Sequence, residues 1–126
     1  MSGEAQLTIS IIVAAGSVRV QVAGELDMAV ETELVETVAT AVADHDASSL
    51  ELDLTHVTFI DSSGLRALLF CRDNAERSGL EVTLIAGDGA VSRLLAVAGV
   101  KDWFTMSPVA RPAAYVDREE LTARPA

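Results

Sequence analysis

The chain has 126 residues, half of them hydrophobic, with a formal charge of −10 and a pI near 4.4. This length and composition suffice for one globular domain with its own core. The acidic balance argues against non-specific binding to nucleic acid or anionic membranes, which depends on Lys and Arg side chains near phosphates. No apolar run approaches the roughly 20 residues that cross a bilayer, and no export signal is recognisable before residue 7. We therefore expect a cytoplasmic protein.

The first two elements expected are strands joined as a hairpin. In residues 7–13 apolar side chains alternate with Thr and Ser, and residues 18–23 repeat the alternation with valines against Arg and Gln. Only a short segment that includes Gly16 separates the two runs, and a glycine can adopt the positive φ of a tight turn. The sequence therefore predicts an antiparallel hairpin.

A helix is expected next, over residues 28–44. Asp27 closes the segment Gly24-Glu25-Leu26-Asp27 and is a candidate N-cap, because its carboxylate can accept hydrogen bonds from the free N–H groups of a first helical turn. Apolar residues then recur at spacings of three and four and form one stripe. A loop that starts at His45 is predicted to follow.

The second half of the chain alternates strands with helices. Alternation over 50–54 predicts a strand, and a loop at Thr55 and His56 is expected to separate it from the apolar segment 57–60. A helix is expected after Asp61 and the two serines, with Leu65, Leu68, Leu69 and Cys71 facing inward and Gly79 at its C-terminal end. The remaining expectations are a strand over 80–84, a helix over 91–98, a strand over 103–106 and a short helix over 113–121.

A hairpin followed by alternating helices and strands predicts an α/β or mixed α+β fold, with a small mixed sheet, right-handed crossovers and helices packed beside the sheet. The sequence contains no repeat and no linker, so residues 1–126 are expected to form a single domain with its core over about 7–106. Residues 107–126, interrupted by Pro108 and Pro112, are expected to be a C-terminal extension.

Metal, cysteine and nucleotide chemistry find little support in the sequence. His45 and His56 fall in separate predicted loops, and the single cysteine, Cys71, lies in an apolar helical pattern that predicts a buried thiol. Lys101 is the only lysine, and no glycine-rich phosphate-binding loop is present. We expect no metal and no cofactor.

The most informative segment is Phe59-Ile60-Asp61-Ser62-Ser63-Gly64-Leu65, where a strand-like run passes into a helix. Asp61 and the serines can cap the free N–H groups of that helix. A serine at a helix N-terminus can also carry a phosphate, because the helix dipole favours negative charge there. Gly64 would leave the first turn uncovered for the close approach of another molecule. Plain capping and phosphorylation both remain open on these residues alone.

A serine hydrolase is the least supported alternative. The nucleophile elbow needs glycines two residues before and two residues after the serine. Ser62 has Ile60 before it and Gly64 after it, while Ser63 has neither glycine. We therefore expect a site that receives chemistry from another protein, and not an enzyme.

Taken together, these segments resemble the STAS domain family, and within it the bacterial anti-sigma-factor antagonists. The Asp-Ser-Ser-Gly sequence in its strand-to-helix context is the specific part of the resemblance, whereas the glycine and leucine framework alone would be weak. The resemblance runs from about Leu7 to Met106 and rests on Gly24-Glu25-Leu26-Asp27, on the segment 59–65, and on Gly79, Leu94-Leu95 and Gly99.

The resemblance implies that an anti-sigma factor with serine kinase activity phosphorylates Ser62, or less readily Ser63, from ATP. It also implies that the unphosphorylated form binds this partner and frees a sigma factor, that the phosphorylated form lets go, and that a serine phosphatase resets the cycle. Asp27, Asp61, Ser62, Ser63 and Gly64 would belong to the docking surface. The alternative within the family is a STAS module of another assembly, such as a stress-signalling scaffold or a lipid-transport complex, in which Ser62 is only structural.

Overall fold

The computed structural model describes residues 7–14 and 16–107, and the backbone of residues 117–123. They form one six-stranded sheet in the order β5-β4-β3-β2-β1-β6. The strands are β1 (Leu7–Ala14), β2 (Ser17–Leu26), β3 (Ser49–Ile60), β4 (Glu81–Ile85), β5 (Met106–Ser107) and β6 (Asp117–Ala123). The helices are α1 (Glu31–Asp44), α2 (Ser62–Arg77) and α3 (Ala90–Ala98), with 3₁₀ turns at Met28–Val30 and Lys101–Trp103.

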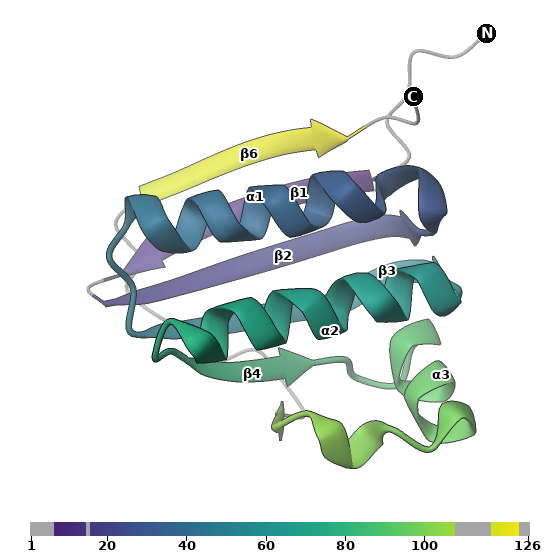
Figure 1. Cartoon of the computed structure of the whole chain (residues 1–126). Helices are drawn as coiled ribbons and strands as arrows, with labels where there is room; N and C mark the ends of the chain where they lie inside the picture. Colours follow the sequence, from purple (N-terminus) through teal and green to yellow (C-terminus); the bar gives the residue numbers. More distant parts are fainter. Residues whose placement is uncertain (1–6, 15, 108–116, 124–126) are drawn as a thin grey trace, which may run out of the picture.

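The sheet is mixed, which confirms the predicted fold class. β1 pairs antiparallel with β2 and with β6, whereas β2, β3, β4 and β5 pair in parallel. The predicted hairpin is present, because β1 and β2 are joined across Gly16, whose φ is +74°. α1 and α2 lie side by side over one face of the sheet (Figure 1).

The core lies between this face and the helices. Val20 of β2 and Leu52 of β3 are register partners and are almost fully buried, as are Leu34 of α1 and Leu68 of α2. Each such side chain contributes about 1.5–3 kcal/mol through removal of its apolar surface from water. The predicted apolar stripes therefore face the core.

One prediction for the middle of the chain needs correction. Thr55 and His56 do not form a loop, because β3 runs without interruption from Ser49 to Ile60. The β2–β3 register shifts between Gln21 and Ala23 and again between Gly24 and Glu25, so pairing continues while the alternation of buried side chains is broken. In the sequence, this break in the alternation has the same appearance as a loop between two strands.

The C-terminal predictions also need correction. Instead of a helix over 113–121, residues 117–123 form β6, and residues 113–116 lie outside the described part of the chain. The outer edge of β1 offers unpaired backbone groups, and pairing with β6 satisfies them. The strand expected over 103–106 is a 3₁₀ turn at Lys101–Trp103, with strand pairing only at Met106–Ser107.

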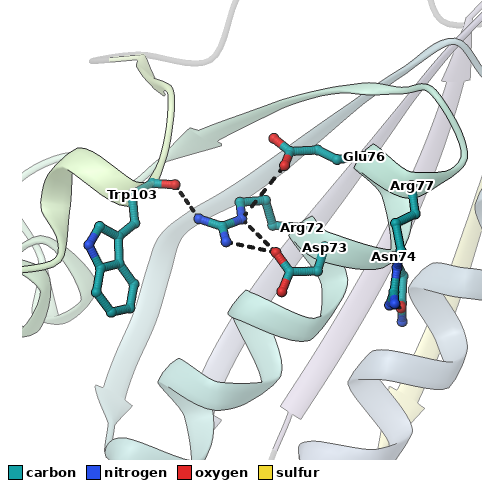
Figure 2. Close-up of polar contacts among 6 residues, drawn as sticks. All are labelled: Arg72, Asp73, Asn74, Glu76, Arg77 and Trp103. Atoms are coloured by element: carbon teal, nitrogen blue, oxygen red, sulfur yellow. Dashed lines mark hydrogen bonds and ion pairs between the residues drawn. The ribbon is translucent and has the colours of Figure 1, made fainter.

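Arg72 of α2 contacts the segment that follows α3. Figure 2 shows its guanidinium reaching the backbone oxygen of Trp103, to which Nη1 donates a hydrogen bond. Nε and Nη2 donate to Asp73 Oδ1 at 3.0 and 2.7 Å, and the guanidinium lies 5.3 Å from the centre of the Phe104 ring. The contacts with Trp103 and Phe104 hold the 3₁₀ turn beside α2.

Gly79 ends α2 as the sequence predicts. Its N–H donates to Glu76 O at 2.9 Å, and the N–H of Leu80 donates to Ala75 O at 3.0 Å. This pair of bonds is a Schellman motif, which places one residue in the left-handed region, and Gly79 has φ +88°.

Replacement of Gly79 by Ala tests this C-terminal cap. An added Cβ would meet no atom within 4 Å, so the cost is the left-handed conformation alone, about 1 kcal/mol of the free energy of unfolding. Urea denaturation should show this loss for Gly79→Ala, a smaller loss for Gly79→Asn, and almost none for Ser78→Ala next to it. Equal stability of Gly79→Ala and the wild type would contradict the assignment.

Candidate functional site

β2 and β3 end side by side, and the candidate site lies just beyond their last pair. Leu26 pairs with Ile60, and the next residues along the two strands are Asp27 and Asp61. The N–H of Asp61 donates to Leu26 O at 3.3 Å, so the two strands stay hydrogen-bonded up to their C-terminal ends. Because the strands are parallel, α1 and α2 both begin at this edge (Figure 1). The structure thus brings Asp27 next to the segment 61–64.

Both aspartates are N-caps. Asp61 has an extended backbone, and its Oδ1 accepts a hydrogen bond from the N–H of Gly64 at 3.0 Å at the start of α2. Oδ1 of Asp27 accepts from the N–H of Ala29 at 2.9 Å and caps the 3₁₀ turn that leads into α1. The predicted cap at Asp61 is therefore confirmed, and α2 does not need a serine as its cap. The helix predicted over 28–44 begins as a 3₁₀ turn capped by Asp27, and α1 itself begins at Glu31 with Val30 as its N-cap.

The two serines differ in exposure. Ser62 is the first residue of α2 and is exposed, whereas Ser63 is half-buried. Within residues 7–14 and 16–107, neither hydroxyl has a hydrogen-bond partner. The Ser62 hydroxyl is thus the more accessible of the two to an enzyme.

The interpretation of Gly64 as an uncovered surface is wrong. Gly64 is buried, and a Cβ added to it would lie 2.4 Å from Leu26 O and 2.8 Å from Ile60 Cγ1. The absence of a side chain lets the first turn of α2 approach the end of β2. Gly64 therefore acts by close packing within the chain and offers no surface to a partner.

An ion pair beside the serines was missed by sequence reasoning. Nε and Nη2 of Arg66 donate to the two carboxylate oxygens of Glu31 at 2.7 and 3.0 Å and so link α2 to α1. The hydrogen bond from Arg66 lowers the pKa of Glu31, and the same bond raises the pKa of Arg66, with a further contribution from the charge of Asp61. No local spacing signals this pair, because Glu31 and Arg66 are 35 positions apart in the chain.

Two large apolar side chains at the same edge are exposed. Met28 follows Asp27 and is 73% exposed, and Phe59, whose register partner is Glu25, is 48% exposed. The sequence pattern predicts a helix at Met28 and an apolar, strand-like segment at Phe59, but it does not predict that either side chain is exposed. Their exposure depends on the fold, because each could equally have packed inward.

The cysteine and the two histidines, which the sequence pattern does not assign to a site, lie in regular elements or at their ends. Cys71 is buried in α2, and desolvation raises the pKa of its thiol to about 12, so the thiol is protonated at neutral pH. His56 lies in β3, and His45 ends α1. Within the described part of the chain, no three His, Cys, Asp or Glu side chains are grouped to hold a metal ion. No helix in that part is long and apolar enough to span a membrane.

The family follows from comparison with known proteins. A protein-family model described as "Mlab, STAS domain" matches residues 13–108. This match covers well over half of the chain, so the chain belongs to the STAS domain family.

Solved structures agree with this assignment. The crystal structure of an anti-sigma factor antagonist from Mycobacterium paratuberculosis has a TM-score of 0.74 and 26% identity, with 86% of this chain and 92% of that chain covered. SpoIIAA, an anti-sigma factor antagonist, has a TM-score of 0.64 and 19% identity in its unphosphorylated form, with 79% and 87% covered. The phosphorylated form of the Bacillus cell fate determinant SpoIIAA has a TM-score of 0.60 and 18% identity, with 79% and 90% covered.

Replacement of Gly64 by Ala tests the packing at the site. The new Cβ would overlap the backbone oxygen of Leu26, which cannot move without disturbing β2, so we expect a loss of about 2 kcal/mol or more in the free energy of unfolding. Chemical denaturation measures it. Ser62→Ala is the matched control, because Ser62 is exposed and should change stability by less than about 0.5 kcal/mol. Unchanged stability of Gly64→Ala would contradict the close approach.

Proposed function

We propose that this protein is an anti-sigma-factor antagonist whose binding is switched off by phosphorylation of Ser62. The observation that carries the proposal is the exposed Ser62 hydroxyl at the start of α2, without a hydrogen-bond partner in the described residues, beside an aspartate that already supplies the cap. Similarity to anti-sigma factor antagonists of known structure supports the general role. The partner that phosphorylates Ser62 is an anti-sigma factor with serine kinase activity, and the exchange takes place in the cytoplasm.

The docking surface in this proposal is the edge where β2 and β3 end. It combines acidic and hydroxyl groups with the exposed side chains of Met28 and Phe59, which offer apolar contact area. Its polar members are Asp27, Asp61, Ser62 and the half-buried Ser63. Gly64 contributes only by holding α2 against β2.

A phosphate on Ser62 would act on the partner more than on this protein's own fold. It adds about −1.5 to −2 charges at a helix N-terminus, where the helix dipole partly compensates them. In this proposal carbonyl or carboxylate oxygens of the partner lie against the Ser62 hydroxyl, so the phosphate would place a desolvated like charge against them. A cost of about 3 kcal/mol would lower the affinity about a hundredfold. A serine phosphatase would restore binding.

A STAS module of another assembly, such as a stress-signalling scaffold or a lipid-transport complex, is the alternative function. In that case Ser62 would be a structural residue with no modification. The matching family model is described by its STAS domain and not by a role in transcription, so it does not separate the two.

Phosphate mapping with the candidate anti-sigma factor tests the proposal. Incubation with this kinase and ATP should add one phosphate at Ser62, located by mass spectrometry, because Ser62 is more exposed than Ser63. Ser62→Ala should abolish the label, and Ser63→Ala is the matched control that should retain it. Labelling of Ser62→Ala at the wild-type level would show that the site assignment is wrong.

The charge-switch mechanism is tested by binding. Ser62→Asp adds negative charge at the exposed position, so calorimetry should show weaker binding to the anti-sigma factor, with a melting temperature within a few degrees of the wild type. Ser62→Asn has a similar size without the charge and should bind nearly as tightly as the wild type. Equal affinity of Ser62→Asp and Ser62→Asn would remove the mechanism.

A further inference from the structure

Arg66 lies one helical turn after Ser62, on the same face of α2. Residues four apart on a helix are neighbours, and a long side chain on a helix points back toward the preceding turn. The Arg66 guanidinium binds both carboxylate oxygens of Glu31 at the start of α1, while the Arg66 side chain remains 57% exposed. The hydrogen bond with Glu31 raises the pKa of Arg66, and the charge of Asp61, the residue before Ser62, makes a smaller contribution in the same direction. A partly exposed cation thus lies one helical turn after Ser62, on the same face of α2.

The guanidinium has hydrogen-bond donors to spare. Glu31 takes one N–H from Nε and one from Nη2, and in the described part of the chain Nη1 of Arg66 has no partner. A guanidinium carries five N–H groups in one plane, so one edge can bind a carboxylate while another binds a phosphate. The pair with Glu31 need not break for Arg66 to bind a second anion.

The charges around Ser62 favour such a partner for a dianionic phosphate. The edge carries the acidic side chains of Glu25 and Asp27 at the end of β2, Glu31 in α1 and Asp61 at the start of α2. In the sequence, Arg66 is the only Lys or Arg between Arg19 and Arg72. A phosphate on Ser62 would therefore meet several carboxylates and a single cation from this part of the chain.

We propose that Arg66 is the intramolecular partner of phosphorylated Ser62, and that its guanidinium bridges the phosphate and the Glu31 carboxylate. This inference rests on the proposed function and adds a residue that regulates the same site. The bridge ties the modified turn of α2 to α1. It stabilises the dianionic phosphate and holds it in one position at the docking surface.

The test uses protein in which phosphoserine is incorporated at position 62 during synthesis, so that no kinase is needed. A ³¹P NMR titration gives the second pKa of the phosphate. A nearby cation favours the dianion, so Arg66→Gln should raise this pKa by about 0.5 to 1 unit relative to the phosphorylated wild type. The Nε–H resonance of Arg66 should also shift when the phosphate is present.

The controls separate a specific contact from a general change of charge. Arg77→Gln removes one positive charge at the other end of α2 and should leave the phosphate pKa within about 0.2 unit of the wild type. Arg66→Lys keeps the positive charge, so the second pKa of its phosphate should lie close to that of the phosphorylated wild type. If Arg66→Gln titrates like Arg77→Gln, and the Arg66 resonance does not respond to the phosphate, the proposal is overturned. Failure of a kinase to label Ser62 would count against the proposed function alone, because this titration does not depend on labelling.

Discussion

The parallel pairing of β2 with β3 is the constraint on which the site depends. Their last pair, Leu26 with Ile60, ends both strands at one edge of the sheet, so the chain leaves each strand at adjacent points. α1 and α2 begin at that edge and present the positive ends of their dipoles there (Figure 1). Residues that are far apart in the sequence, Asp27 and Asp61, are neighbours for this reason. An edge of this kind accommodates added negative charge without rearrangement of the core.

Within the edge, structural and exposed roles belong to different side chains. Asp61 caps α2, Asp27 caps the turn before α1, and Gly64 allows α2 to pack against the backbone of Leu26. Gly64 is the most restricted of these three positions, because an added Cβ would overlap the backbone oxygen of Leu26. Ser62 has none of these tasks, so a modification of its hydroxyl need not unfold the helix. Capping and the proposed phosphorylation are thus compatible, because different residues would perform them.

A change in the charge of Ser62 would act on a bound partner and on the neighbouring helix α1. Exposed Met28 and Phe59 lie at the same edge and give a partner apolar surface beside the polar groups. The bond between Arg66 and Glu31 joins the two helices at this point, close to where a phosphate would be added. The apolar core beneath consists of side chains such as Leu52 and Leu68, which carry no charge and do not respond directly to one.

The sequence by itself determined the features that depend on near neighbours. Alternating and helical patterns predicted the β1–β2 hairpin, α2 and its end at Gly79, and the cap at Asp61, because each requires residues only a few positions apart. The tertiary structure alone decided that Gly64 is buried, that β3 continues through His56 and that residues 117–123 pair with β1. It also decided the exposure of Met28 and the ion pair of Arg66 with Glu31. These outcomes depend on contacts between residues distant in the chain, which no local pattern records.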